Sequence, residues 1–351
     1  MKKEIPFLHV ARVIACLMVV GLHSLPKVPL PGIDSKFSLI ILLITRPCVP
    51  IFFMITGALL LPYSGGDIST FYKKKISRIV FPLLFWGIIY SVIPYVLGRE
   101  NLDQMWLNIY SLVLNFPKNI GGILWYLYIL AGLYLIIPFI NPDVFKQRQL
   151  IKFYLVIWLT ACMCLFVKIY RPEILGVGQS STFDMLHYFS GYLGYLFLGF
   201  YLTNNNVLEL KISKNKLKYY VFFLAIMIVC MLIIAVVLKI TAANNNIPLS
   251  QTIHSFLSLP VIIMSGSCYL MIKHYEISTS SKSYKIIKHL SSYTLGIYLS
   301  HMVIYHFFTL NFYNISTSPL IQVCVIICTF GGAYLLTLLL SKFYYSSYII
   351  G

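Results

Sequence analysis

Long apolar runs recur along almost the whole 351-residue chain and constrain its fold more than any other feature. A helix that crosses the hydrocarbon core of a bilayer needs about 20 mostly apolar residues. The fold class is therefore expected to be all-α, a polytopic membrane helix bundle that forms a single domain over residues 1–351. The runs predict about ten membrane-spanning helices, near residues 5–25, 37–62, 76–98, 120–140, 149–168, 184–203, 217–240, 251–272, 289–310 and 317–343.

The composition excludes a soluble globular protein. Hydrophobic residues make up 59% of the chain and charged residues only 11%, whereas soluble domains have about 45–50% and about 25%. The eight cysteines all lie in apolar segments and form no CxxC pair. They are typical of small buried apolar side chains rather than of a disulfide framework or a zinc site, so we expect no metal.

The net charge of +17 is distributed as a topology signal rather than as a nucleic-acid-binding patch. Lysine and arginine cluster in every second loop, while the loops between these clusters carry few or balanced charges. Positive loops stay in the cytosol, so both termini are predicted to be cytosolic and the number of spans to be even. The basic clusters lie at residues 2–3, 73–78, 146–152, 211–218 and 273–288.

Arg12 and His23 are charged or titratable groups inside the first predicted span. They are eleven residues apart, which on an α-helix returns to within about 20° of the same face and separates the two by about 16 Å. One interpretation is that a basic anchor and a titratable base line one wall of a cavity. The alternative is that Arg12 extends to the headgroups and His23 only marks the end of the helix.

Two further polar groups lie within predicted spans, where charges are costly. Arg46 directly precedes Pro47, so its guanidinium could hydrogen-bond carbonyls that the proline frees, or could hold an anion. The simpler alternative is a polar cluster that only sets the kink. His301 lies in the middle of the ninth predicted span. It is either functional or a packed histidine bonded to a backbone carbonyl.

Basic and aromatic residues gather at two span ends. Lys74, Lys75 and Arg78 lie where a cytosolic loop enters the third predicted span. Lys75 and Arg78 are three residues apart and hence neighbours on a helix, a spacing that suits a diphosphate. Such a cluster is also common as a topology signal. Trp125 and Tyr128 open the fourth span, where an interfacial aromatic belt is expected in any case.

Together these residues resemble acyltransferase family three, bacterial membrane proteins that O-acylate surface glycans, and in particular its members with the membrane domain alone. The resemblance extends from Arg12 to about Gly351. It rests on six elements in order: Arg12-x10-His23; RPCVPIFFMITG at residues 46–57; Lys75-x-x-Arg78; LWYLY at 124–128; GYLGY at 191–195; and SYTLGIYLSH at 292–301.

The resemblance implies roles for these residues. His23 would be the essential base, Arg12 and Arg46 would line the catalytic cavity, and the basic cluster would bind the phosphates of coenzyme A. The acyl donor would be acetyl-CoA or another acyl-CoA, the acceptor a glycan or lipid-linked glycan, and the location the bacterial inner membrane. The remaining positions carried over are Lys74, Lys75, Arg78 and Trp125 for the cofactor, and Tyr128, Tyr298 and His301 for the cavity.

The chain departs from the family pattern at two positions, and other functions stay open. His9 stands where the family often has an acidic or amide residue, and Lys75 where arginine is commoner. Kinked helices with buried arginine or histidine also suit a transporter or exporter of a polysaccharide or small solute, or a silent module that assists another enzyme. The basic cluster together with His23 favours the enzyme, because an exporter has no need to bind coenzyme A.

Overall fold

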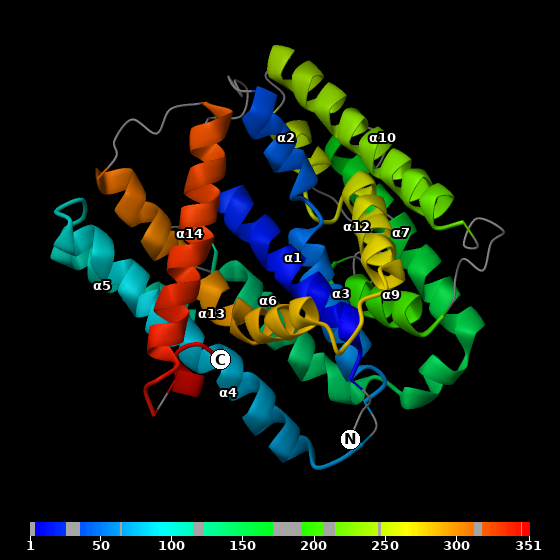
Figure 1. Cartoon of the computed structure of the whole chain (residues 1–351), viewed down its shortest axis with the longest axis horizontal. Helices are drawn as coiled ribbons and strands as arrows, with labels where there is room; N and C mark the ends of the chain where they lie inside the picture. Colours follow the sequence, from blue (N-terminus) through cyan, green and yellow to red (C-terminus); the bar gives the residue numbers. More distant parts are fainter. Residues whose placement is uncertain are drawn as a thin grey trace. The chain divides into compact units, whose positions relative to one another are not determined.

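Every regular element of the described residues is a helix, as expected for the all-α class (Figure 1). The structure is a computed structural model, and no strand occurs in the ranges that it describes. These ranges are residues 4–25, 36–63, 65–114, 123–170, 191–205, 215–244, 247–311, 318–344 and 346–351.

Five helices in these ranges are long and apolar enough to cross a membrane, by length and composition. They agree with five of the predicted runs, whereas the count of about ten and the cytosolic termini stay predictions. Trp125–Phe139 and Leu259–His274 are shorter apolar helices. The five are α1 (Pro6–His23), the pair α2 (Lys36–Ile44) and α3 (Cys48–Leu60) taken as one, α4 (Ile68–Val96), α10 (Lys216–Ala243) and α14 (Pro319–Leu340).

The structure differs from the sequence prediction at several element boundaries. The apolar run at 251–272 is divided between α11 (Ile247–Ile253) and α12 (Leu259–His274). Of the run at 184–203, only α9 (Leu193–Asn204) is described as a helix, because 171–190 lie outside the described residues. The remaining helices are α5 (Leu102–Leu114), α6 (Trp125–Ile136), η1 (Ile137–Phe139), η2 (Pro142–Lys146), α7 (Arg148–Tyr170), α13 (Lys282–Asn311) and η4 (Ser346–Tyr348).

Helix α4, which corresponds to the third predicted span, begins eight residues before the predicted start at 76. Asp67 caps it by accepting hydrogen bonds from the backbone N–H groups of Ser69 (3.3 Å) and Thr70 (2.9 Å). Such a cap satisfies donors that the first helical turn leaves without partners. Because of this cap, the basic residues at 73–78 lie within a helix and not in a loop.

The chain divides into two compact units. Unit 1 contains Met1–Pro62 and Asn141–Ser291, and unit 2 contains Tyr63–Ile140 and Ser292–Gly351. In unit 1, α3 packs against α1, α9 and α12, and α10 packs against α12, α11 and α2. In unit 2, α4 packs against α5, α6 and η4. The single domain expected for residues 1–351 stays a prediction.

Glycines allow two helices of unit 1 to approach closely. A Cβ atom added to Gly57 of α3 would overlap the backbone of Leu196, and one added to Gly199 of α9 would overlap the backbone of Met54. Small residues at such contacts let helix backbones touch, which is how helices associate in membranes. The α3–α9 contact is therefore fixed by the absence of side chains at two positions.

We predict that Gly199→Ala destabilises unit 1, because the added methyl group has to displace a backbone. Overpacking of this kind costs about 1–3 kcal/mol. Gly266→Ala on α12 is the matched control, since a Cβ there meets only Leu202 Cδ1 at 4.0 Å. Thermal unfolding in detergent should show a lowered Tm for Gly199→Ala alone. Equal Tm values for the two variants would contradict the close α3–α9 contact.

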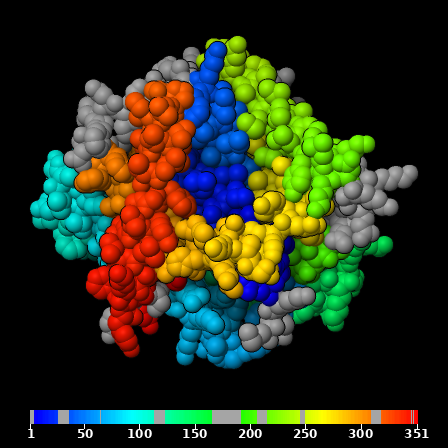
Figure 2. All heavy atoms as spheres, in the orientation of Figure 1, coloured from blue at the N-terminus to red at the C-terminus, as the bar shows by residue number. Residues whose placement is uncertain are grey.

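Helix α10 carries an apolar surface that suits contact with lipid. Helix α10 is the yellow-green segment in Figure 2. Most of its exposed side chains are large and apolar, as suits the outer face of a membrane bundle. They include Val221, Phe222, Leu224, Ile228, Val229, Leu232, Ile233 and Val236.

Polar contacts in unit 1 join segments that the charge pattern assigns to one side of the membrane. Lys216, at the start of α10, forms a 2.8 Å ion pair with Glu276, just after α12. Lys273 donates hydrogen bonds to the carbonyl oxygens of Leu202 (2.7 Å) and Thr203 (3.0 Å), at the end of α9. The ends of α9 and α12 and the start of α10 therefore lie together, in agreement with the predicted grouping of the loops at 211–218 and 273–288.

Candidate functional site

Helix α1 positions both Arg12 and His23. It is continuous from Pro6 to His23, so the two side chains keep the spacing of eleven residues that places them on one face. Both residues are half-buried. The helix ends immediately after His23, where the N–H of Ser24 donates to the carbonyl oxygen of Val20 (2.9 Å). The imidazole therefore lies at the carboxyl end of the helix, where the helix dipole favours positive charge.

Arg46 lies in the break between α2 and α3. Its backbone N–H donates to the Leu43 carbonyl (3.2 Å), so the Leu42 carbonyl has no helical N–H partner from Arg46. The Arg46 side chain fills this gap, because its Nε donates to the Leu42 oxygen at 3.3 Å. Thr45 Oγ1 donates to the same oxygen at 3.2 Å. Of the roles that the sequence leaves open for Arg46, a hydrogen bond to a freed carbonyl is therefore present, while a role in catalysis stays a prediction.

The rest of the Arg46 guanidinium faces the connection between α11 and α12. Nη1 donates to the carbonyl oxygen of His254 (3.2 Å), and the guanidinium carbon lies 5.7 Å from the centre of the Phe256 ring. The residue is only 8% exposed. Among the described residues no carboxylate forms an ion pair with Arg46, so its compensation comes from carbonyl dipoles and one aromatic face. A buried cation held in this way can still attract an anion or a developing oxyanion.

The predicted phosphate-binding residues lie on α4 in unit 2. Lys74 and Arg78 are exposed, and Lys75 is half-buried. The helix is continuous through all three, so Lys75 and Arg78 are neighbours on its surface, as the sequence predicts. The cluster can present several N–H donors to an anionic group.

The predicted aromatic and histidine candidates of unit 2 pack in its interior. Tyr128 donates to the Leu112 carbonyl (2.8 Å), and Tyr298 donates to the Ile123 carbonyl. His301 is fully buried, and its Nδ1 donates to the Tyr298 carbonyl (2.5 Å). Trp125, at the start of α6, is half-buried. The bond of His301 to a backbone carbonyl is the one that a packed histidine would make, and a role in a cavity stays a prediction for all four.

The structure thus divides the predicted site residues between the units. The residues predicted to act on the reacting atoms belong to unit 1, and those predicted to bind the acyl donor or line the cavity belong to unit 2. The first group is Arg12, His23 and Arg46; the second is Lys74, Lys75, Arg78, Trp125, Tyr128, Tyr298 and His301.

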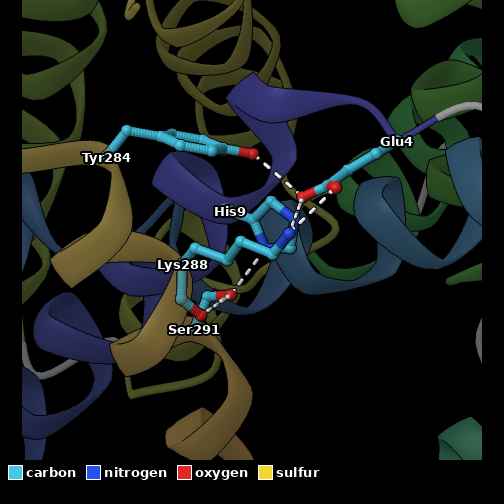
Figure 3. Close-up of polar contacts among 5 residues, drawn as sticks. All are labelled: Glu4, His9, Tyr284, Lys288 and Ser291. Carbon is cyan, nitrogen blue, oxygen red and sulfur yellow. Dashed lines mark hydrogen bonds and ion pairs between the residues drawn. The ribbon is translucent and has the colours of Figure 1, made fainter. Parts of the chain in front are cut away.

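A second polar cluster in unit 1 was not found by sequence reasoning. Figure 3 shows the Glu4 carboxylate pointing toward Tyr284, Lys288 and His9. Tyr284 Oη donates to it at 2.9 Å, Lys288 Nζ lies 2.9 Å from Oε1, and His9 Nε2 donates at 3.0 Å. His9 Nδ1 lies 2.6 Å from Ser291 Oγ. The cluster ties the start of α1, one turn before Arg12, to the first turns of α13.

Electrostatics keep the Glu4 carboxylate ionised. The hydrogen bond from Lys288 is the largest cause that lowers the pKa of Glu4 below its ordinary value of 4.5, followed by the hydrogen bond from Tyr284. A lowered pKa in the folded state means that ionised Glu4 stabilises the fold above about pH 4.5 and loses this effect as the pH falls through the lowered value.

We predict that Glu4→Gln lowers the Tm at pH 7 and that the difference from wild type shrinks below about pH 4.5. The carboxylate of wild type becomes protonated there and resembles the amide. Thermal unfolding of both proteins at pH 7, 5, 4 and 3 measures this difference. A difference that stays constant over the series would contradict the stabilising role of ionised Glu4.

Comparison with models of protein families explains why the six sequence motifs occur together in this order. A family model described as an acyltransferase domain matches residues 5–338. The chain belongs to acyltransferase family 3. This confirms the resemblance seen in the motifs, and it makes the protein a multi-pass membrane acyltransferase. All ten predicted site residues of the acyltransferase lie inside the matched range. The comparisons with curated proteins and with solved structures found no match.

Proposed function

We propose that the protein transfers an acetyl or other short acyl group from cytosolic acyl-CoA to a hydroxyl group of a cell-envelope glycan or its lipid-linked precursor, in the bacterial inner membrane. The observation that carries this proposal is the guanidinium of Arg46, which is buried without a carboxylate partner among the described residues. It lies in the same unit as His23 and Arg12, in a chain that belongs to an acyltransferase family.

The basic cluster on α4 is proposed to hold the acyl donor. Coenzyme A carries a diphosphate and a 3′-phosphate, and charge-assisted hydrogen bonds to such groups are about twice as strong as neutral ones. Lys75 and Arg78 are neighbours on one helical face, and Lys74 extends the cluster. Their charges would fix the nucleotide and leave the acyl thioester to enter the helix bundle.

His23 is proposed to act as general base. The hydroxyl oxygen of the acceptor bonds to the thioester carbonyl carbon, the carbon–sulfur bond breaks, and the hydroxyl proton passes through the imidazole to the departing thiolate. The products are an ester and the free thiol of coenzyme A. A histidine suits this task because the ordinary pKa of an imidazole is close to neutral pH.

Arg46 and Arg12 are proposed to stabilise the negative charge that develops on the carbonyl oxygen. Fixed N–H donors act more strongly in an apolar site than in water and need no reorganisation during the reaction. Arg46 is fixed by its bonds to the Leu42 and His254 carbonyls. Arg12 lies on the same helical face as His23.

We predict that His23→Ala lowers acyl transfer by at least about 100-fold, the usual effect of losing a general base. Purified protein in liposomes would receive labelled acetyl-CoA together with membrane glycans of the native host, and labelled glycan would be counted. His289→Ala, an exposed position on α13, is the matched control and should keep wild-type activity.

Transfer at the wild-type rate by folded His23→Ala would disprove the assignment of the base. A folded wild type that neither binds nor consumes acetyl-CoA, or a longer acyl-CoA, would disprove the enzymatic proposal. Solute or glycan export would then be the function to assay.

A further inference from the structure

The connection between α11 and α12, residues 254–258, is held rigidly against the Arg46 break. Arg46 Nη1 donates to the His254 carbonyl (3.2 Å), and Tyr195 of α9 donates to the Phe256 carbonyl. The Phe256 side chain packs on a buried apolar cluster that includes Ile253 and Val261. Anchors on both sides thus fix the backbone on which His254 stands.

The hydrogen bonding of the His254 ring determines its tautomer. Nδ1 lies 2.5 Å from the carbonyl oxygen of Ser250. A carbonyl oxygen only accepts, so Nδ1 carries the proton, and in the neutral imidazole Nε2 then holds a lone pair. The hydrogen bond to the Ser250 carbonyl thus fixes which ring nitrogen carries the proton. His254 therefore presents a hydrogen-bond acceptor at a fixed position.

Two residues in direct contact, Arg46 and His254, thereby offer hydrogen-bond donors and a hydrogen-bond acceptor. The Arg46 guanidinium supplies N–H donors and its neighbour His254 supplies an acceptor. A sugar hydroxyl is both donor and acceptor, so it can give its proton to a hydrogen bond with Nε2 and accept one from the guanidinium. A phosphate or carboxylate, which has no proton to donate at neutral pH, would use only the guanidinium.

The position of Arg46 along the second predicted span indicates the direction from which such a ligand arrives. Arg46 lies ten residues after Lys36, the first residue of α2, or about 15 Å along the helix axis. The charge pattern predicts that Lys36 lies on the side of the membrane opposite the cytosol. A ligand that reaches Arg46 and His254 by this end enters from the extracytosolic side.

We propose that His254 and Arg46 form the subsite for the acyl acceptor, in which His254 Nε2 accepts a hydrogen bond from a sugar hydroxyl that enters from the extracytosolic side. This inference rests on the proposed acyl transfer. It makes His254 a specificity-determining residue for the acceptor and gives it no part in binding acetyl-CoA. Removal of the acceptor nitrogen should therefore affect transfer to the glycan and leave attack by water unchanged.

The experiment compares two reactions in reconstituted full-length protein: transfer of labelled acetyl from acetyl-CoA to membrane glycans of the native host, and hydrolysis of acetyl-CoA without glycan. His254→Phe should lower kcat/KM for the glycan about tenfold, the effect of one hydrogen bond. It should change hydrolysis and the KM for acetyl-CoA less than about twofold. His254→Gln, whose Oε1 can accept a hydrogen bond, should recover most of the transfer.

The matched control is His274→Phe, a histidine of unit 1 that stacks on Tyr219 at the other end of α12. It should keep both reactions at the wild-type level. Unchanged transfer in His254→Phe would overturn the inference, as would equal losses of transfer and hydrolysis in a protein of wild-type Tm. A wild type that performs neither reaction would overturn the proposed function as well, which separates that failure from a failure of the subsite alone.

Discussion

Burial of the Arg46 charge is the constraint on which much of unit 1 depends. A cation inside an apolar helix bundle costs several kcal/mol unless polar groups surround it. The chain supplies them at the break between α2 and α3, where Pro47 lies: Leu42 offers a freed carbonyl, and the His254 carbonyl approaches from the α11–α12 connection. The hydrogen bonds that stabilise the cation therefore also hold the end of α2 and the α11–α12 connection against the break.

This arrangement links packing with the proposed chemistry. The backbones of α3 and α9 touch at Gly57 and Gly199, so the helix that follows Arg46 has little freedom to move. Tyr195 of α9 in turn holds the backbone beside His254. A guanidinium fixed in this way is preorganised, and preorganised donors are the ones that stabilise a developing charge without reorganisation.

The sequence predicted the features that depend on local pattern. The α1 helix with Arg12 and His23, the break at Arg46 and the helical spacing of Lys75 and Arg78 follow from hydropathy, proline and residue spacing. It missed α5 because that helix is amphipathic and has no long apolar run. It also missed the Glu4–Ser291 cluster and the contact of His254 with Arg46, because these join residues more than 200 positions apart, and no local pattern encodes such pairs.

The most direct test of the account is the rate of acyl transfer by Arg46→Lys in liposomes under saturating acetyl-CoA. Lysine keeps the positive charge, but all of its N–H donors lie on one nitrogen, whereas Arg46 bonds the Leu42 and His254 carbonyls from two separate nitrogens of a planar group. We predict a folded protein that binds acetyl-CoA as wild type does and transfers the acyl group at least about 100-fold more slowly. A wild-type rate in folded Arg46→Lys would contradict the central role of the guanidinium.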